Sequence, residues 1–202
     1  VVFVWLLNVL PPTTVSPIAH EPEVVPQRLT AQETDPFKGR RDAPVTVIMV
    51  GSYTCPACAE SAVVLDQLLA LYPESVKIVW KDTPESVGDS YRAALAARCA
   101  QQQGRFWEYH DVLYANREQL ATRAFYALWA KALGLREDIF TACLDGAETK
   151  ALVDRNIGEV LQAGVSEVPY FQINNEQGVS GSQSLGYFRT AVETALETVP
   201  QL

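Results

Sequence analysis

The stretch "APVTVIMVGSYTCPACAES" (residues 43–61) joins a buried-strand pattern to a helical pattern, with a Cys-Pro-Ala-Cys motif (residues 55–58) at the junction. Residues 43–50 form a short, β-branched apolar run of the kind found in the centre of a sheet. Pro56 falls where the first turn of a helix tolerates proline, and apolar residues then recur on one helical face until Pro73. The stretch therefore predicts a strand followed by a helix that begins at the motif.

The chain continues with further strand and helix signals. "VKIVW" (76–80) predicts a second strand, which completes a right-handed parallel strand-helix-strand unit. A strongly helical block follows from about residue 90 to 163, with glycines at the expected helix ends. "VPYFQIN" (168–174) and "GVSGS" (178–182) predict two antiparallel strands, and residues 185–199 predict an amphipathic helix. This order indicates an α/β sheet domain that is split by an inserted helical segment.

Composition and charge narrow the class of protein. The chain has 202 residues, of which 48% are hydrophobic and 20% are charged, and this is enough for one sizeable domain with a buried core. The net charge is −8 and no basic cluster is longer than Arg40-Arg41, so a nucleic-acid partner is not expected. Four cysteines are too few for a small scaffold stapled by disulfides.

The first 36 residues have a different character. Residues 1–10, "VVFVWLLNVL", are uniformly apolar, and we interpret them as a truncated signal or membrane anchor, with a buried strand or helix as the alternative. Ten helical residues are too few to cross about 30 Å of hydrocarbon. Residues 11–36 hold six of the twelve prolines and predict an extended, poorly packed linker, in which His20 is solvated. Export or membrane attachment through the N-terminus is therefore expected.

The Cys55/Cys58 pair could bind a metal, staple a loop or exchange electrons. Structural zinc needs four ligands, usually from two such pairs, whereas this sequence has one pair, two isolated cysteines and two histidines without ligand spacing. A cysteine at a helix N-terminus faces unpaired N–H donors, which lower the pKa of its thiol from about 8.5 into the range of about 3.5 to 7.5. Cys55 occupies that place, and Cys58 would be the more buried resolving thiol. We favour redox exchange, without a metal or cofactor.

Five blocks of sequence, in the right order and spacing, carry a resemblance to a known family: "DPFKGRRDAPVTVIMVGSYTCPAC", "VKIVWKDTP", "CAQQQGRFWEYHDVLYANRE", "FTACLDG" and "GVSEVPYFQIN". Over roughly residues 35–200 the chain resembles the DsbA-like branch of the thioredoxin superfamily. The resemblance implies a thioredoxin fold over residues 37–202, with a central mixed sheet, flanking helices and a helical domain inserted at about 88–164. It also implies a monomeric thiol:disulfide oxidoreductase.

The resemblance also assigns residues around the motif. Cys55 and Cys58 would be the catalytic pair, and a cis bond between Val168 and Pro169 would face them. From the sequence alone, the proline could equally be an ordinary trans proline that starts an edge strand. Five residues would contact the substrate: Val168, Pro169, Tyr53, Pro56 and Ala57.

The sequence departs from the family pattern where a proton must move. Many relatives carry an acidic residue six positions before the first cysteine, and here that residue is Met49. Lys81 and Asp82 are candidates for a substitute proton relay, with two solvated charges at a strand end as the alternative. Ser52 stands where an acidic residue is common, three positions before the motif.

Cys99 and Cys143 lie 44 positions apart, each on an apolar helical face. They could be two inert buried thiols, but an oxidising compartment favours a structural disulfide between them. His110 is expected to be a helix-packing or surface residue rather than a base, because thiol exchange does not require one.

The expected function is the introduction of disulfides into reduced exported proteins, at the bacterial periplasm or the outer face of the cell membrane. By resemblance, a DsbB-like or vitamin K epoxide reductase-like membrane partner would reoxidise the pair. A disulfide isomerase or reductase is an alternative, because Pro-Ala between the cysteines lacks the histidine of strongly oxidising relatives. A non-catalytic thioredoxin-fold binding or chaperone module is a second alternative.

Overall fold

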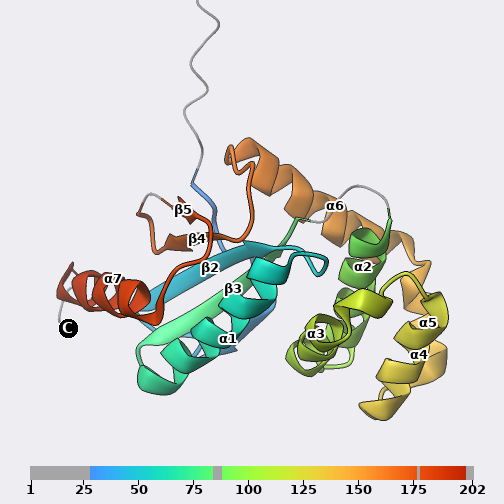
Figure 1. Cartoon of the computed structure of the whole chain (residues 1–202). Coiled ribbons are helices and arrows are strands. Elements are labelled where there is room, and N and C mark those ends of the chain that lie inside the picture. The colour runs from blue at the N-terminus through green and yellow to red at the C-terminus, as the bar shows by residue number, and fades with distance from the viewer. Residues whose placement is uncertain (1–27, 84–87, 177, 199–202) are drawn as a thin grey trace, which may run out of the picture.

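The computed structural model describes residues 28–83, 88–176 and 178–198 (Figure 1). The interpretation of residues 1–10 as a signal or anchor, and that of residues 11–27 as a linker, fall outside this part of the chain. Within it, no helix is both long enough and apolar enough to cross a bilayer.

A five-stranded mixed sheet with the order β1-β3-β2-β4-β5 forms the centre of the fold. Its strands are β1 (Phe37–Gly39), β2 (Val45–Gly51), β3 (Val76–Asp82), β4 (Tyr170–Ile173) and β5 (Val179–Ser180). The central pair, β2 and β3, is parallel, and the other three pairs are antiparallel. This confirms the predicted strand-helix-strand unit and the mixed sheet.

Both faces of β2 are covered, which explains its nearly continuous apolar sequence. Val47 and Met49 point into the larger core, to which α1 (Pro56–Leu71) and α7 (Leu185–Thr198) contribute. Ile48 and Val50 point into a second core on the other face, with side chains of α6 (Ala147–Gln162). Figure 1 shows α1 and α7 on one side of the sheet and α6 on the other.

The helical insertion lies between β3 and β4, as the sequence predicts. It consists of α2 (Asp89–Gln102), α3 (Phe106–Ala115), a short 3₁₀ turn (Arg117–Gln119), α4 (Arg123–Ala132), α5 (Glu137–Leu144) and α6. A disulfide joins Cys99 in α2 to Cys143 in α5, with 5.7 Å between their Cα atoms. The insertion is therefore covalently closed on itself.

The linker prediction is wrong for residues 28–36, which pack on the sheet domain. Leu29 is buried in the second core, and its backbone N–H and C=O both bond to the side chain of Gln172 in β4. Asp35 is buried as well. The proline content of the segment indicated an extended backbone. It gave no sign that the Gln172 side chain in β4 would bind that backbone.

The sequence also missed β1, the antiparallel edge strand that pairs with β3. It has only three residues, so no alternating pattern can develop. Gly39 ends it at a φ of 95°, where a β-carbon would lie 2.5 Å from the carbonyl oxygen of Val76. A residue with a side chain would clash there, and glycine is required.

Candidate redox-active site

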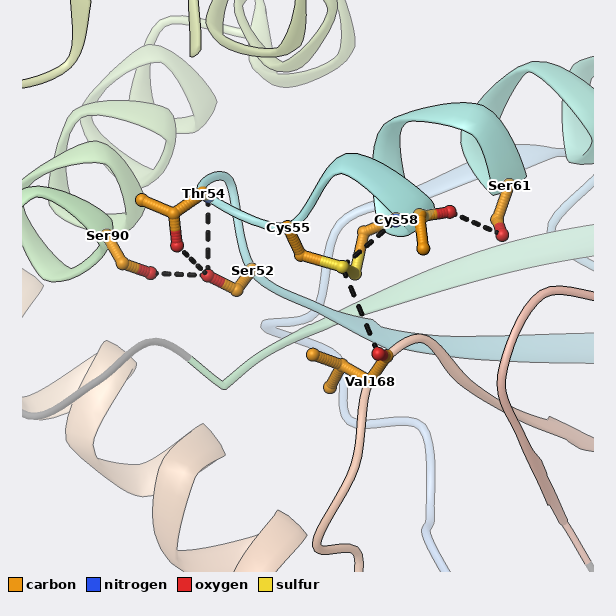
Figure 2. The surroundings of a disulfide bond; sticks show 8 residues. Ser52, Thr54, Cys55, Cys58, Ser61, Ser90 and Val168 are labelled. Carbon is orange, nitrogen blue, oxygen red and sulfur yellow. Dashed lines mark hydrogen bonds between the residues drawn. A yellow bond between two sulfur atoms is a disulfide. The ribbon is translucent and has the colours of Figure 1, made fainter. Parts of the chain in front are cut away.

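Cys55 and Cys58 form a disulfide at the N-terminus of α1 (Figure 2). Cys55 is the N-cap residue, with extended backbone, and Pro56 occupies the first turn, where its missing N–H is no loss. The backbone N–H of Cys58 donates to Cys55 Sγ at 3.0 Å. Cys58 is fully buried, whereas Cys55 is half-buried and Pro56 is exposed. Of the two sulfurs, Cys55 Sγ is the one that an incoming group can reach.

The local electrostatics favour a negative charge on Cys55 when the pair is reduced. The first turn of α1 contains no acidic residue, so nothing in that turn offsets the positive end of the helix dipole. The Cys58 N–H already points at the sulfur and would stabilise a thiolate there. These local features stabilise the thiolate of Cys55 and so favour Cys55 as the nucleophile of the pair.

The Val168–Pro169 segment lies opposite the pair. Its peptide bond is cis, the isomer that the resemblance implies, and Cys55 Sγ lies 3.9 Å from the carbonyl oxygen of Val168. Because β4 runs antiparallel to β2, with Tyr170 beside Val50, the residues just before β4 reach the end of β2 at which the motif begins. Two segments more than 100 residues apart therefore meet at the disulfide.

Ser52 connects the redox loop to the helical insertion. Its hydroxyl lies 2.5 Å from the hydroxyl of Ser90 in the first turn of α2 and 3.0 Å from that of Thr54 (Figure 2). All three groups are neutral hydroxyls. The loop before Cys55 is therefore fixed by hydrogen bonds that add no charge.

The prediction that Tyr53 lines an exposed substrate groove is wrong for its side chain, which is only 1% exposed. Its ring packs against Trp80, His110 and Tyr114, with ring centroids 5.4, 5.5 and 5.1 Å away. Helix α3 supplies two of these neighbours. The inward direction of the ring depends on α3, which lies more than 50 residues further along the chain.

Lys81 and Asp82 are not solvated charges at a strand end, because both side chains are buried in ion pairs. Lys81 Nζ lies 2.7 Å from Asp35 and also pairs with Glu159 of α6. Asp82 accepts from Arg98 Nε at 2.6 Å and from Trp80 Nε1 at 2.7 Å. None of these bonds reaches the cysteines.

Asn156 of α6 joins the two ion pairs into one network. It donates to Asp35 and accepts from Arg98 and from the backbone N–H of Asp82. The sequence analysis missed Asp35, Arg98, Asn156 and Glu159. A single arginine within the alanine-rich face of "AALAARCA" was the one signal of a buried cation. The network holds β3, α2, α6 and the segment before β1 together.

Within the described ranges, no group of three or more His, Cys, Asp or Glu side chains is placed so that it could hold a metal ion. The two catalytic candidates are bonded to each other instead.

A sheet with this order, a helix that starts at a Cys-x-x-Cys disulfide and a facing cis-proline define a thioredoxin-type protein. A sequence model of the family described as thioredoxin matches residues 31–194, and the chain belongs to this family.

Solved structures share this fold over more than four fifths of the chain. A thioredoxin-like oxidoreductase from Silicibacter pomeroyi superposes with a TM-score of 0.75 at 23% identity, covering 83% of this chain and 95% of that one. The α-DsbA1 protein of Wolbachia pipientis superposes with a TM-score of 0.73 at 17% identity, covering 84% and 94%. The DsbA-like architecture implied by the sequence is thereby confirmed.

Curated proteins similar in sequence are much longer. The chain is 32% identical over 147 residues to the Na⁺/H⁺ antiporter NhaA 3 of Salinispora tropica, an alignment that covers 72% of this chain. The same alignment covers only 22% of the length of that antiporter. The chain thus matches one segment of a much longer protein.

Proposed function

We propose that this protein is a DsbA-type thiol:disulfide oxidoreductase that works through the Cys55–Cys58 pair. One observation carries the proposal. A disulfide at a helix N-terminus has one buried sulfur and one that is accessible beside the Val168 carbonyl. Val168, Pro169, Pro56 and Ala57 surround the accessible sulfur in this proposal and would contact the substrate.

The exchange follows from this asymmetry. A substrate thiolate attacks Cys55 Sγ in line with the bond to Cys58, the Cys55–Cys58 bond breaks, and a mixed disulfide with the substrate forms. Cys58 leaves as a thiolate and takes up a proton. A second substrate thiolate then attacks the substrate sulfur of the mixed disulfide, which releases an oxidised substrate and the Cys55 thiolate. Two electrons pass from the substrate to the pair.

The substrates that we propose are reduced exported proteins, at the bacterial periplasm or the outer face of the cell membrane. The Cys99–Cys143 bridge supports such a compartment, because structural disulfides persist where the surroundings are oxidising. A DsbB-like or vitamin K epoxide reductase-like membrane partner would then reoxidise the pair. Isomerase or reductase activity is the alternative direction for the same chemistry.

The first test is oxidation of a reduced test protein that needs disulfides to fold. Wild-type protein should restore its activity, and Cys55→Ser and Cys58→Ser should each abolish this effect, because neither variant can carry the disulfide that oxidises the test protein. A Cys55→Ser variant as active as the wild type would refute the proposal and favour a non-catalytic binding module.

The direction of electron flow is tested by equilibrium with glutathione. A reduction potential near about −120 mV would match an oxidase such as DsbA, and one near about −270 mV would match a reductase such as thioredoxin. The same measurement on Cys99→Ala/Cys143→Ala assigns the potential to the Cys55–Cys58 pair.

A further inference from the structure

A buried cluster of aromatic rings lies under the redox loop. It consists of Tyr53, Trp80, His110 and Tyr114, whose exposed fractions are at most 6%. His110 is its centre, with ring centroids 5.5 Å from Tyr53, 5.0 Å from Trp80 and 4.8 Å from Tyr114. The larger core that contains the two tyrosines and Trp80 also contains Cys58. The cluster and the resolving sulfur therefore lie in the same buried core.

Three polar atoms of this cluster lack a hydrogen-bond partner. They are Tyr53 Oη, His110 Nε2 and Tyr114 Oη, and no other buried side-chain nitrogen or oxygen in the described ranges is without one. A buried polar group left unpaired costs about 1–3 kcal/mol, so one such atom needs an explanation. Three such atoms within one ring cluster point to a site for water.

Asp111 orients the imidazole. His110 Nδ1 lies 3.1 Å from the Asp111 carboxylate, which accepts the Nδ1–H and leaves the lone pair on Nε2. Burial lowers the pKa of His110 below its ordinary value, so the ring is neutral near pH 7 and Nε2 is a free acceptor. Asp111 itself is exposed and can exchange with solvent.

A small cavity adjoins both the His110 side chain and the redox helix α1. Its volume is about 10 Å³, close to the smallest space that holds one water molecule. His110 and Met49 line it together with Ala62 and Leu65 of α1. Ala62 follows Cys58 by one helical turn on the same buried face. Met49, which also lines the cavity, offers no group that could accept a proton.

We propose that His110, oriented by Asp111, is the internal base that exchanges a proton with Cys58 through water in this cavity. The proposal rests on the thiol:disulfide exchange proposed above and revises the sequence-based interpretation of His110 as a packing residue. When Cys58 resolves a mixed disulfide, its S–H proton passes through water to His110 Nε2. The Cys58 thiolate then attacks Cys55 Sγ, and the bond from Cys55 to the substrate sulfur breaks. The substrate leaves as a thiolate, and the imidazolium returns its proton to solvent.

The charged and titratable groups around His110 and its ring cluster come from several elements. Lys38 of β1 and Asp66 of α1 form an ion pair on the solvent side of the cavity, and Lys38 lines it. Asp82 of β3 is held by Arg98, as described above. Burial raises the pKa of Tyr53 and of Tyr114 well above 10, so both stay neutral donors. Near neutral pH, His110 is thus the acceptor that can gain a proton from the cavity.

The experiment is a single-turnover oxidation of the fully reduced protein by glutathione disulfide at several pH values, with acid quenching and mass analysis. Formation of the Cys55–glutathione mixed disulfide and its resolution by Cys58 are thereby timed separately. In His110→Gln, resolution should be about 100-fold slower at pH 7, the scale of a lost general base. The deficit should shrink toward pH 9.5, where hydroxide deprotonates Cys58 directly.

Two further variants on α3 separate proton transfer from packing. Asp111→Asn should show a smaller loss with the same pH dependence. Glu108→Gln removes another exposed carboxylate from the same helix and should resolve the mixed disulfide like the wild type. If His110→Gln does not fold, the pH profile of Asp111→Asn decides alone.

Resolution at the wild-type rate in His110→Gln, or in Asp111→Asn where that variant decides, overturns the proposal. So does a deficit equal at every pH, since that indicates altered packing. Failure of the underlying redox function would look different, because no mixed disulfide would form on Cys55 even in the wild type.

Discussion

The Cys99–Cys143 bridge should be a major part of the stability of this protein. It closes a segment of 44 residues between α2 and α5, and the two sulfurs are nearly or fully buried. In the chain-entropy model, a closed loop of that length stabilises the folded state by about 4 kcal/mol. At about 2–4 °C for each kcal/mol in a chain of this size, Cys99→Ala/Cys143→Ala should melt about 8–16 °C lower.

The assay is urea unfolding of both proteins with the Cys55–Cys58 pair fully oxidised, so that a single bridge differs. Retention of that pair is checked by mass analysis before and after each titration. The expected result is a loss of about 4 kcal/mol in the free energy of unfolding. A loss below about 1 kcal/mol would refute the reasoning, because the insertion would then be held by its packing alone.

Two further outcomes concern buried charge. Arg98→Met leaves the buried Asp82 carboxylate without its cation and should lower the free energy of unfolding by about 3–5 kcal/mol. Arg136→Met removes one side of an exposed ion pair and should leave the urea midpoint unchanged. Equal urea midpoints for the two variants would contradict this. Because burial lowers the pKa of His110, only the unfolded chain gains that proton just below pH 6.5. The free energy of unfolding should therefore decrease as the pH is lowered below about 6.5, and it should decrease less steeply in His110→Gln. Identical pH profiles of urea stability in the two proteins would contradict this.

The parts of the fold that could be predicted are those whose signal is local. The apolar run of β2, the proline at the start of α1 and the glycine-terminated helices all lie within short windows of sequence. β1 could not be predicted, because its three residues become a strand only through pairing with β3. The packing of residues 28–36 likewise depends on Gln172, which lies more than 130 residues away.

The site divides in the same way. The spacing of Cys55 and Cys58 and their place before a helix are local features, and the structure joins the two as expected. The directions of Tyr53, Lys81 and Asp82 are not local. Each depends on a helix of the insertion: α3 covers Tyr53, α6 supplies one of the two partners of Lys81, and α2 supplies the cation that pairs with Asp82.

The insertion therefore does more than cover one end of the sheet. It contributes Ser90 to the loop before Cys55, and His110 and Tyr114 to the cluster below that loop. Without these helices, the loop would lose its hydroxyl partner and the rings of Tyr53 and Trp80 would lose their cover. If reduction or oxidation of the Cys55–Cys58 pair shifts the redox loop, it changes the free energy of these contacts. By linkage, the strength of these contacts then also affects the redox equilibrium of the pair. The two halves of the domain work as one thermodynamic unit, closed at its far end by the second disulfide.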